Sequence, residues 1–216
     1  MKLNVIGGCI VYFVFSIPVY AGNVISDIPE NPDTSTKYIF YVHGSVEEAE
    51  GSTEKYEAAV EAIAESTATV ISEIRGETEP NVYAKKLKRQ VNSLISKGVP
   101  AKNITVSGYS KGAIISLATA GAVQNADINY VLLAGCSESL NDKYSVDPKK
   151  SAGRILSIFD SGDDKYGSCS GIVSKSDKVK FKEIKLNTGK GHKLFRIPKD
   201  KFIEKWRDPL VDWAGA

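Results

Sequence analysis

Short apolar runs alternate along the chain with longer segments in which apolar residues recur every three or four positions. The short runs are typical of buried strands, and the longer spacing is typical of one face of a helix. The predicted strands are 38–42, 69–74, 104–106, 130–134, 155–159 and 179–184. The predicted helices are 53–65, 81–96, 111–122 and 199–213.

This alternation predicts βαβ units, because each right-handed crossover lays a helix on a parallel sheet. The expected fold class is α/β, a three-layer αβα sandwich around a mainly parallel sheet of about six strands. A chain of 216 residues is long enough for one well-packed domain and too short for two ordinary ones.

The first 21 residues differ in composition from the rest. Lys2 precedes an apolar run at 5–19, and small residues surround a cleavage point before Gly22. This arrangement is typical of a secretory signal peptide, and the run is short for a membrane-spanning helix, which needs about 20 apolar residues. A retained membrane anchor is the alternative. The expected segments are a signal peptide at 1–21, an irregular lead-in at 22–37 and one domain at 38–216. We therefore expect a periplasmic or secreted protein without stable membrane insertion after signal removal.

Removal of the signal leaves two cysteines, Cys136 and Cys169. Disulfides persist in an oxidising compartment, so we expect a disulfide between them, with two buried free thiols as the alternative. One cysteine pair without further cysteines or a spare histidine does not make a zinc site, and no metal is expected.

The formal net charge of +2 is small, and basic residues are interleaved with acidic ones. Surfaces that bind nucleic acid usually concentrate basic residues in a patch or stripe. We therefore expect no nucleic-acid partner.

The segment 108–112 has the sequence Gly-Tyr-Ser-Lys-Gly and lies between a predicted strand and a predicted helix. It matches G-x-S-x-G in the context that this pattern requires. Glycine at both ends permits a sharp reversal that projects Ser110 above the sheet edge at a helix N-terminus. Taken alone, the five residues also fit an ordinary turn.

His43 and Gly44 end the first predicted strand. If the sheet order reverses beside that strand, its carboxyl end and that of the third strand form a crevice. The backbone amides of Ser45 and Lys111 would then face one oxyanion from two sides. Such preorganised donors contribute about 3 to 4 kcal/mol each to transition-state stabilisation.

A carboxylate cluster and a histidine follow two later strands. Asp160, Asp163 and Asp164 lie at the end of the fifth predicted strand, and His192 lies in a glycine-bounded loop between the last strand and the last helix. The chain order is thus serine, acid, histidine, as expected when an elbow serine follows the third strand of such a sheet.

With these motifs the chain resembles the α/β-hydrolase superfamily, in particular its small, lidless, secreted esterase-like members. The resemblance covers the chain from about residue 37 onward and rests on His43-Gly44, the Ser110 elbow, the aspartate loop and the His192 loop. It implies an α/β-hydrolase core with the sheet order 2-1-3-4-5-6. It also implies a triad in which Ser110 attacks an acyl carbon, His192 passes the proton to the leaving group and a carboxylate orients the imidazole.

The resemblance implies Asp163 as the acid, because in this superfamily the acid commonly lies three residues beyond the small residue that follows the strand. The chain departs from the pattern at Asp160, where such proteins often have glycine. Asp160 and Asp164 are therefore the alternative acids.

His43 and three lysines have a structural interpretation beside the functional one. The chain has only two histidines, so His43 is the alternative general base, although chain order favours a role in bracing the first loop through hydrogen bonds to the backbone. Lys111, Lys190 and Lys193 flank the predicted site and would favour an anionic substrate, whereas scattered lysines are usually solvated surface.

We expect a serine hydrolase that cleaves carboxylic esters or thioesters of small, accessible molecules through an acyl-enzyme. The polar segment 136–153 leaves little material for an apolar lid over a long-chain lipid site. The alternatives are a peptidase or amidase, because the same triad cleaves amides, and a non-catalytic secreted binding protein on this fold. The expected chemistry requires no metal or organic cofactor.

Overall fold

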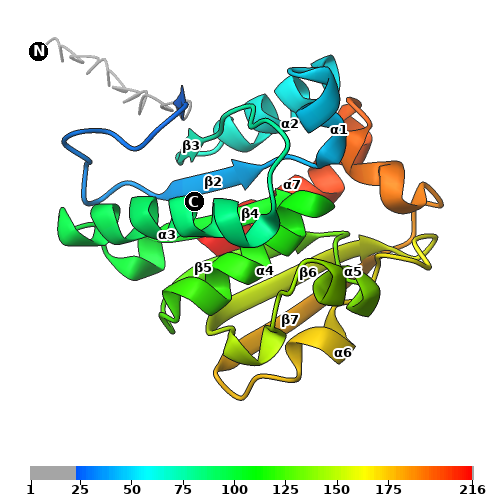
Figure 1. Ribbon diagram of the computed structural model, residues 1–216. Helices are drawn as coiled ribbons and strands as arrows, with labels where there is room; N and C mark the ends of the chain where they lie inside the picture. Colours follow the sequence, from blue (N-terminus) through cyan, green and yellow to red (C-terminus); the bar gives the residue numbers. More distant parts are fainter. Residues whose placement is uncertain (1–22, 216) are drawn as a thin grey trace, which may run out of the picture.

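The structure is a computed structural model that describes residues 23–215. The expected signal peptide at 1–21 lies outside the described residues. Within 23–215, seven strands form one fully parallel sheet in the order β1-β3-β2-β4-β5-β6-β7 (Figure 1).

Strands and helices are interspersed along the described chain. The strands are β1 (Val24–Ile25), β2 (Tyr38–Val42), β3 (Thr69–Ile71), β4 (Ile104–Tyr109), β5 (Asn129–Leu133), β6 (Gly153–Asp160) and β7 (Val179–Leu186). The α-helices are α1 (Ser45–Glu50), α2 (Glu54–Ala64), α3 (Pro80–Ser96), α4 (Lys111–Val123), α5 (Glu138–Lys143), α6 (Ser170–Val173) and α7 (Asp200–Ala214). Short 3₁₀ segments are η1 (Ala101–Asn103), η2 (Pro148–Lys150) and η3 (Gly191–Arg196).

The α/β fold class and the predicted sheet order are confirmed, because the six expected strands lie in the order β3-β2-β4-β5-β6-β7. The strand count is too low by one. Val24 pairs with Val70 and Ile25 with Ile71, so the lead-in at 22–37 contributes a short edge strand and is not wholly irregular. Two residues are too few to give the alternation from which strands are predicted.

Strand β3 is shorter than the predicted strand 69–74. It ends at Ile71, and the chain then leaves the sheet toward α3, where Glu73 accepts a hydrogen bond from the Tyr83 hydroxyl at 2.7 Å. The segment after β3 therefore lies at the carboxyl edge of the sheet, beside the end of β2.

The core lies on both faces of the sheet. On β2, Tyr38, Phe40 and Val42 pack in the cluster under α3 and α4, whereas Ile39 and Tyr41 pack in the cluster under α2 and α7. These two pairs of helices cover opposite faces, which gives the expected three layers (Figure 1). Because both faces are covered, every residue of β2, β4 and β5 is buried.

The expected disulfide joins Cys136, just after β5, to Cys169, the residue before α6. The Cys169 N–H also donates to the Glu183 carboxylate of β7 at 2.7 Å. The disulfide therefore links the loops that follow two neighbouring strands at the carboxyl edge of the sheet.

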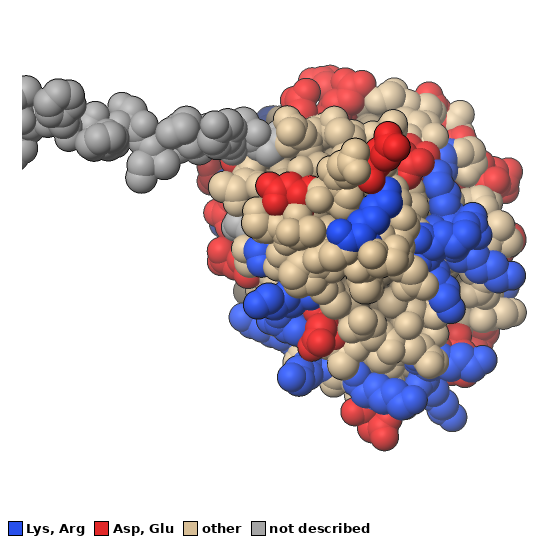
Figure 2. Space-filling model, turned by 90° about the vertical axis from the view of Figure 1, so that its left-hand side faces the viewer, with Lys and Arg blue, Asp and Glu red and all other residues tan. Residues whose placement is uncertain are grey.

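The opposite edge of the sheet, where the strands begin, faces the viewer in Figure 2. Basic and acidic side chains both occur across that face. Among residues 23–215, no helix combines the length and the apolar character that a membrane span requires.

Candidate active site

Ser110 lies in the sharp turn between β4 and α4, as the G-x-S-x-G pattern predicts. Its backbone has φ 55° and ψ −117°, a conformation that residues with a side chain rarely adopt. The turn also needs close backbone approach on both sides. A Cβ atom on Gly108 would lie 2.3 Å from the Gly112 oxygen, and one on Gly112 would lie 1.9 Å from the Val42 oxygen. The two glycines therefore let the elbow sit directly against the end of β2.

His192 lies between Ser110 and Asp163. Its Nε2 atom is 3.1 Å from Ser110 Oγ, and its Nδ1 atom is 2.8 Å from Asp163 Oδ2. An ionised carboxylate only accepts hydrogen bonds, so Nδ1–H donates to Asp163 and the bare Nε2 faces the serine hydroxyl. The Asp163 side chain is 2% exposed and that of His192 is 28% exposed. The imidazole can therefore take a proton from Ser110 in a site that substrate can reach.

Asp160 is fully buried and holds the loop that carries His192. Its carboxylate accepts hydrogen bonds from the N–H and the hydroxyl of Thr188 at 2.7 and 2.6 Å, from Gly191 N–H at 2.9 Å and from Gly162 N–H at 3.1 Å. Burial alone would raise the pKa of Asp160, but these four hydrogen bonds outweigh it and hold the pKa below its ordinary value. Asp164, the other alternative acid, is exposed.

Two tyrosines fix the position of His192. The Tyr109 hydroxyl donates to the His192 carbonyl at 3.0 Å, and the ring centroids of Tyr109 and Tyr166 lie 5.1 and 4.9 Å from that of the imidazole. Burial raises the pKa of Tyr109, so its hydroxyl stays a neutral donor. His192 is therefore held by its backbone as well as by its ring.

His43 is buried, with 2% of its surface exposed. It braces the loop that follows β2 through hydrogen bonds to the backbone, as expected. Its Nε2 atom accepts the Arg75 N–H at 2.9 Å, and its Nδ1–H donates to the Gly44 oxygen at 2.8 Å. Burial lowers the pKa of His43, and the nearby Arg75 charge adds to this. The ring is thus neutral, and both of its nitrogens are occupied by the backbone.

The backbone amides of Ser45 and Lys111 belong to the first residues of α1 and α4. The N–H of a first helical residue has no acceptor within its own helix. A Cβ atom on Gly44 would lie only 3.5 Å from Ser110 Cβ, so the start of α1 is adjacent to the elbow. The structure therefore brings both predicted amide donors to the neighbourhood of Ser110.

Sequence reasoning missed a group of buried charges behind these two helix starts. Glu48 Oε1 lies 3.0 Å from Arg75 Nη2, and Glu48 Oε2 lies 2.7 Å from Lys111 Nζ. Glu47 pairs in a similar way with Arg196 at 3.1 Å. The short acidic segment after His43-Gly44 resembles a solvated helix face, and only its position directly after a crevice-forming strand hints at another role.

An open cleft of about 1020 Å³ surrounds Ser110 and His192. The segment 136–153 contributes Leu140 and Tyr144 to one wall. Among the described residues, none of those that line the cleft is acidic, whereas five are basic: Lys55, Lys111, Lys190, Lys193 and Arg196. Lys111 and Arg196 are ion-paired with buried glutamates, so a preference for anionic substrates would depend on the other three, of which Lys190 and Lys193 were named from the sequence and Lys55 was not.

In the part of the chain that the structure describes, no group of three or more His, Cys, Asp or Glu side chains is arranged to hold a metal ion.

Comparisons with known proteins concern the fold and the family of the chain. No curated protein sequence matches the chain. Among solved structures, a putative dienelactone hydrolase from Klebsiella pneumoniae is similar with a TM-score of 0.59 at 12% identity, covering 87% of this chain and 90% of that one. Est1E from Butyrivibrio proteoclasticus, with ferulic acid bound, has a TM-score of 0.56 at 12% identity, covering 88% and 94%. A lipase-esterase related protein from Clostridium acetobutylicum has a TM-score of 0.56 at 14% identity, covering 84% and 96%.

These structural likenesses concern the fold, since the identities are low. The family is shown by the sequence, because residues 72–201 match the model of the phospholipase/carboxylesterase family. That match runs from the residue after β3 to the start of α7 and includes Ser110, Asp163 and His192. The chain therefore belongs to the phospholipase/carboxylesterase family, esterase-type hydrolases of the α/β-hydrolase superfamily.

Proposed function

We propose that this chain is a serine carboxylesterase that cleaves carboxylic esters or thioesters of small, accessible molecules through an acyl-enzyme. Ser110 is the nucleophile, His192 the general base and Asp163 the acid. The observation that supports this assignment is the position of His192, with Nε2 3.1 Å from Ser110 Oγ and Nδ1 2.8 Å from Asp163 Oδ2.

The reaction proceeds in two halves. Ser110 Oγ attacks the acyl carbon while His192 Nε2 takes the hydroxyl proton, and the imidazolium then protonates the departing alcohol or thiol. Water next attacks the acyl-enzyme, giving its proton to Nε2, and Ser110 leaves with that proton as the acid product is formed. Asp163 balances the imidazolium charge in both halves.

The carbonyl oxygen becomes an oxyanion each time the acyl carbon is attacked. We assign its stabilisation to the N–H groups of Ser45 and Lys111, at the starts of α1 and α4 beside Ser110. The partial exposure of His192 and the open cleft favour substrates that reach the site without displacing a lid.

We further propose that the protein acts in the periplasm or outside the cell. The disulfide between Cys136 and Cys169 supports this, because such bonds persist in oxidising compartments and are rare in the cytosol. Fractionation of cells that express the full chain, with mass determination of the product, tests both the location and removal of residues 1–21.

Labelling with a fluorophosphonate tests the assignment of Ser110. We expect covalent labelling of the wild-type protein and none of Ser110→Ala, which keeps the turn and removes only the hydroxyl. Folded protein that is not labelled in a Ser110-dependent way contradicts the proposed function and favours a binding role.

A substrate panel tests the reaction class. We expect turnover of short nitrophenyl esters and of short-chain thioesters, with little cleavage of peptide nitroanilides. Peptide cleavage at comparable kcat/KM would replace the esterase assignment with a peptidase one. His192→Ala should remain folded and lose turnover in every assay.

A further inference from the structure

The Ser45 N–H and the Gly44 carbonyl belong to one peptide unit. In a planar trans peptide these two groups point in opposite directions. Any contact that holds the Gly44 oxygen therefore also fixes the direction of the Ser45 N–H. The Gly44 oxygen has two buried donors, His43 Nδ1 at 2.8 Å and Arg75 Nη2 at 3.4 Å.

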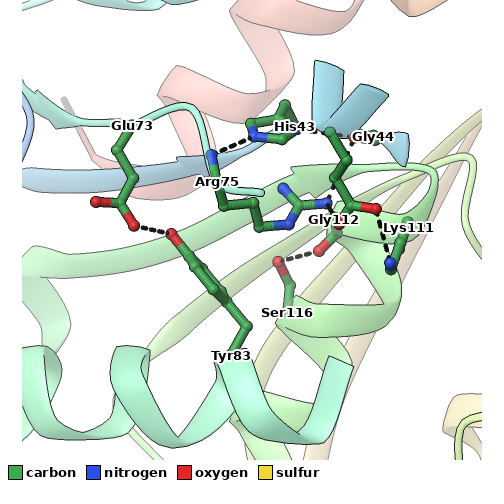
Figure 3. Close-up of polar contacts among 9 residues, drawn as sticks. His43, Gly44, Glu73, Arg75, Tyr83, Lys111, Gly112 and Ser116 are labelled. Carbon is green, nitrogen blue, oxygen red and sulfur yellow. Dashed lines mark hydrogen bonds and ion pairs between the residues drawn. The ribbon is translucent and has the colours of Figure 1, made fainter. Parts of the chain in front are cut away.

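Arg75 controls both of these donors. Its guanidinium donates directly to the Gly44 oxygen, and its backbone N–H donates to His43 Nε2 at 2.9 Å. Because Nε2 accepts, the proton of the neutral ring must lie on Nδ1, which is the atom that faces Gly44. One residue thus supplies one donor and selects the tautomer that supplies the other (Figure 3).

Glu48 ties this arrangement to the elbow. Its carboxylate pairs with Arg75 on one side and with Lys111 on the other, and the three side chains are 5%, 3% and 11% exposed in that order. Glu48 belongs to α1, which begins at Ser45, and Lys111 is the first residue of α4. A single buried carboxylate therefore connects the two helices that carry the proposed amide donors.

We propose that Arg75 is a positioning residue that, through His43 and the Gly44 carbonyl, directs the Ser45 N–H toward the oxyanion. Glu48 in turn fixes the position of the Ser45 N–H relative to the Lys111 N–H. This inference rests on the proposed function. Arg75 is not among the residues that line the cleft, so it acts through the peptide and not on the substrate.

The expected effect falls on the transition state and not on substrate binding. Removal of an oxyanion-hole donor lowers kcat by about 100- to 1,000-fold. Arg75→Met keeps the backbone N–H that holds His43, so it removes the guanidinium donor to the Gly44 oxygen and leaves the His43 donor. The peptide is then held less firmly, and we expect kcat to fall about 10- to 100-fold with KM within about twofold of the wild-type value.

Tyr83→Phe is the matched control. Tyr83 packs against Arg75, with the guanidinium carbon 5.5 Å from the ring centroid, and its hydroxyl donates to Glu73 in the same segment. The substitution loosens this segment without touching the Gly44 oxygen. We expect wild-type kcat from Tyr83→Phe.

The experiment compares Arg75→Met, Glu48→Gln and Tyr83→Phe in ester hydrolysis and in binding of a trifluoromethyl ketone. The ketone forms an oxyanion on Ser110, and the corresponding secondary alcohol, which forms none, serves as the reference ligand. Thermal unfolding establishes that each variant is folded. We expect Arg75→Met to lower the affinity for the ketone by the same factor as it lowers kcat. Its affinity for the alcohol should stay within about twofold of the wild-type value.

A folded Arg75→Met with wild-type kcat and ketone affinity overturns the proposal, while Ser110-dependent turnover leaves the proposed function standing. Equal losses of ketone and alcohol binding also overturn it, because they indicate general disruption of the cleft. If Arg75→Met does not fold, Glu48→Gln decides: we expect an about tenfold lower kcat at unchanged KM, and an unchanged kcat counts against the proposal. If the wild-type protein shows no Ser110-dependent turnover, the proposed function itself is contradicted.

Discussion

Gly191, the residue before His192, donates its backbone N–H to Asp160 Oδ1 at 2.9 Å. Asp160 ends β6, and Asp163 follows three residues later with its carboxylate on the imidazole. The Asp160 carboxylate thus holds the backbone just before His192, whereas the Asp163 carboxylate holds the His192 ring. Removing each should therefore have a different consequence.

Asp163→Asn should lower kcat by about 1,000- to 10,000-fold, because the amide no longer favours the tautomer that leaves Nε2 bare. Asp160→Asn should instead lower the free energy of unfolding by about 2 to 3 kcal/mol, because a charged acceptor of four hydrogen bonds is lost. Urea unfolding and steady-state kinetics on both variants separate the two effects. The reverse pattern would assign the acid to Asp160.

Acid sensitivity should follow from Asp160 as well. Its pKa in the folded protein is below the value of about 3.9 in the unfolded chain, so the unfolded state binds more protons between these two values. The stability that Asp160 contributes is therefore complete above about pH 4 to 5 and is lost as the pH falls through the folded pKa. The difference in unfolding free energy between wild type and Asp160→Asn, measured from pH 7 to pH 2.5, should shrink below about pH 4. A difference that stays constant over that range contradicts this account.

Reduction of the disulfide between Cys136 and Cys169 should destabilise the fold. The bond joins positions 33 residues apart, and closing a loop of this length stabilises by about 3 to 4 kcal/mol in the chain-entropy model. Thermal unfolding of the oxidised protein with and without a reductant measures the effect. The double variant Cys136→Ala/Cys169→Ala serves as the control, since its melting temperature should not respond to the reductant.

Esters that carry a negative charge should be better substrates than neutral esters of the same size. Lys55, Lys190 and Lys193 line the cleft, and none of them forms an ion pair within the described chain. We expect about tenfold higher kcat/KM for a monoester of succinate than for the matched butyrate ester at low salt, with the advantage falling as ionic strength rises. Equal values at all salt concentrations would mean that these lysines are merely solvated.

The sheet could be predicted from the sequence because its strands are buried on both faces and therefore consist of apolar runs. The candidate site could be predicted in part for another reason: Ser110, Asp163 and His192 each follow a predicted strand, and parallel strands end at one edge. The network around Glu48 could not be predicted. Its glutamate and Arg75 lie 27 positions apart in segments that look polar and exposed, and their burial depends on how α1 packs against the chain after β3.

The backbone of Ser110, with φ 55°, has a consequence beyond catalysis. A conformation of this kind costs about 1 to 3 kcal/mol in a residue with a Cβ atom, whereas glycine adopts it readily. The proposed nucleophile thus occupies a position where another residue would make a more stable protein. Descendants of this chain that no longer needed turnover would gain stability by exchanging Ser110 for glycine. Loss of activity by this substitution would therefore increase the free energy of unfolding.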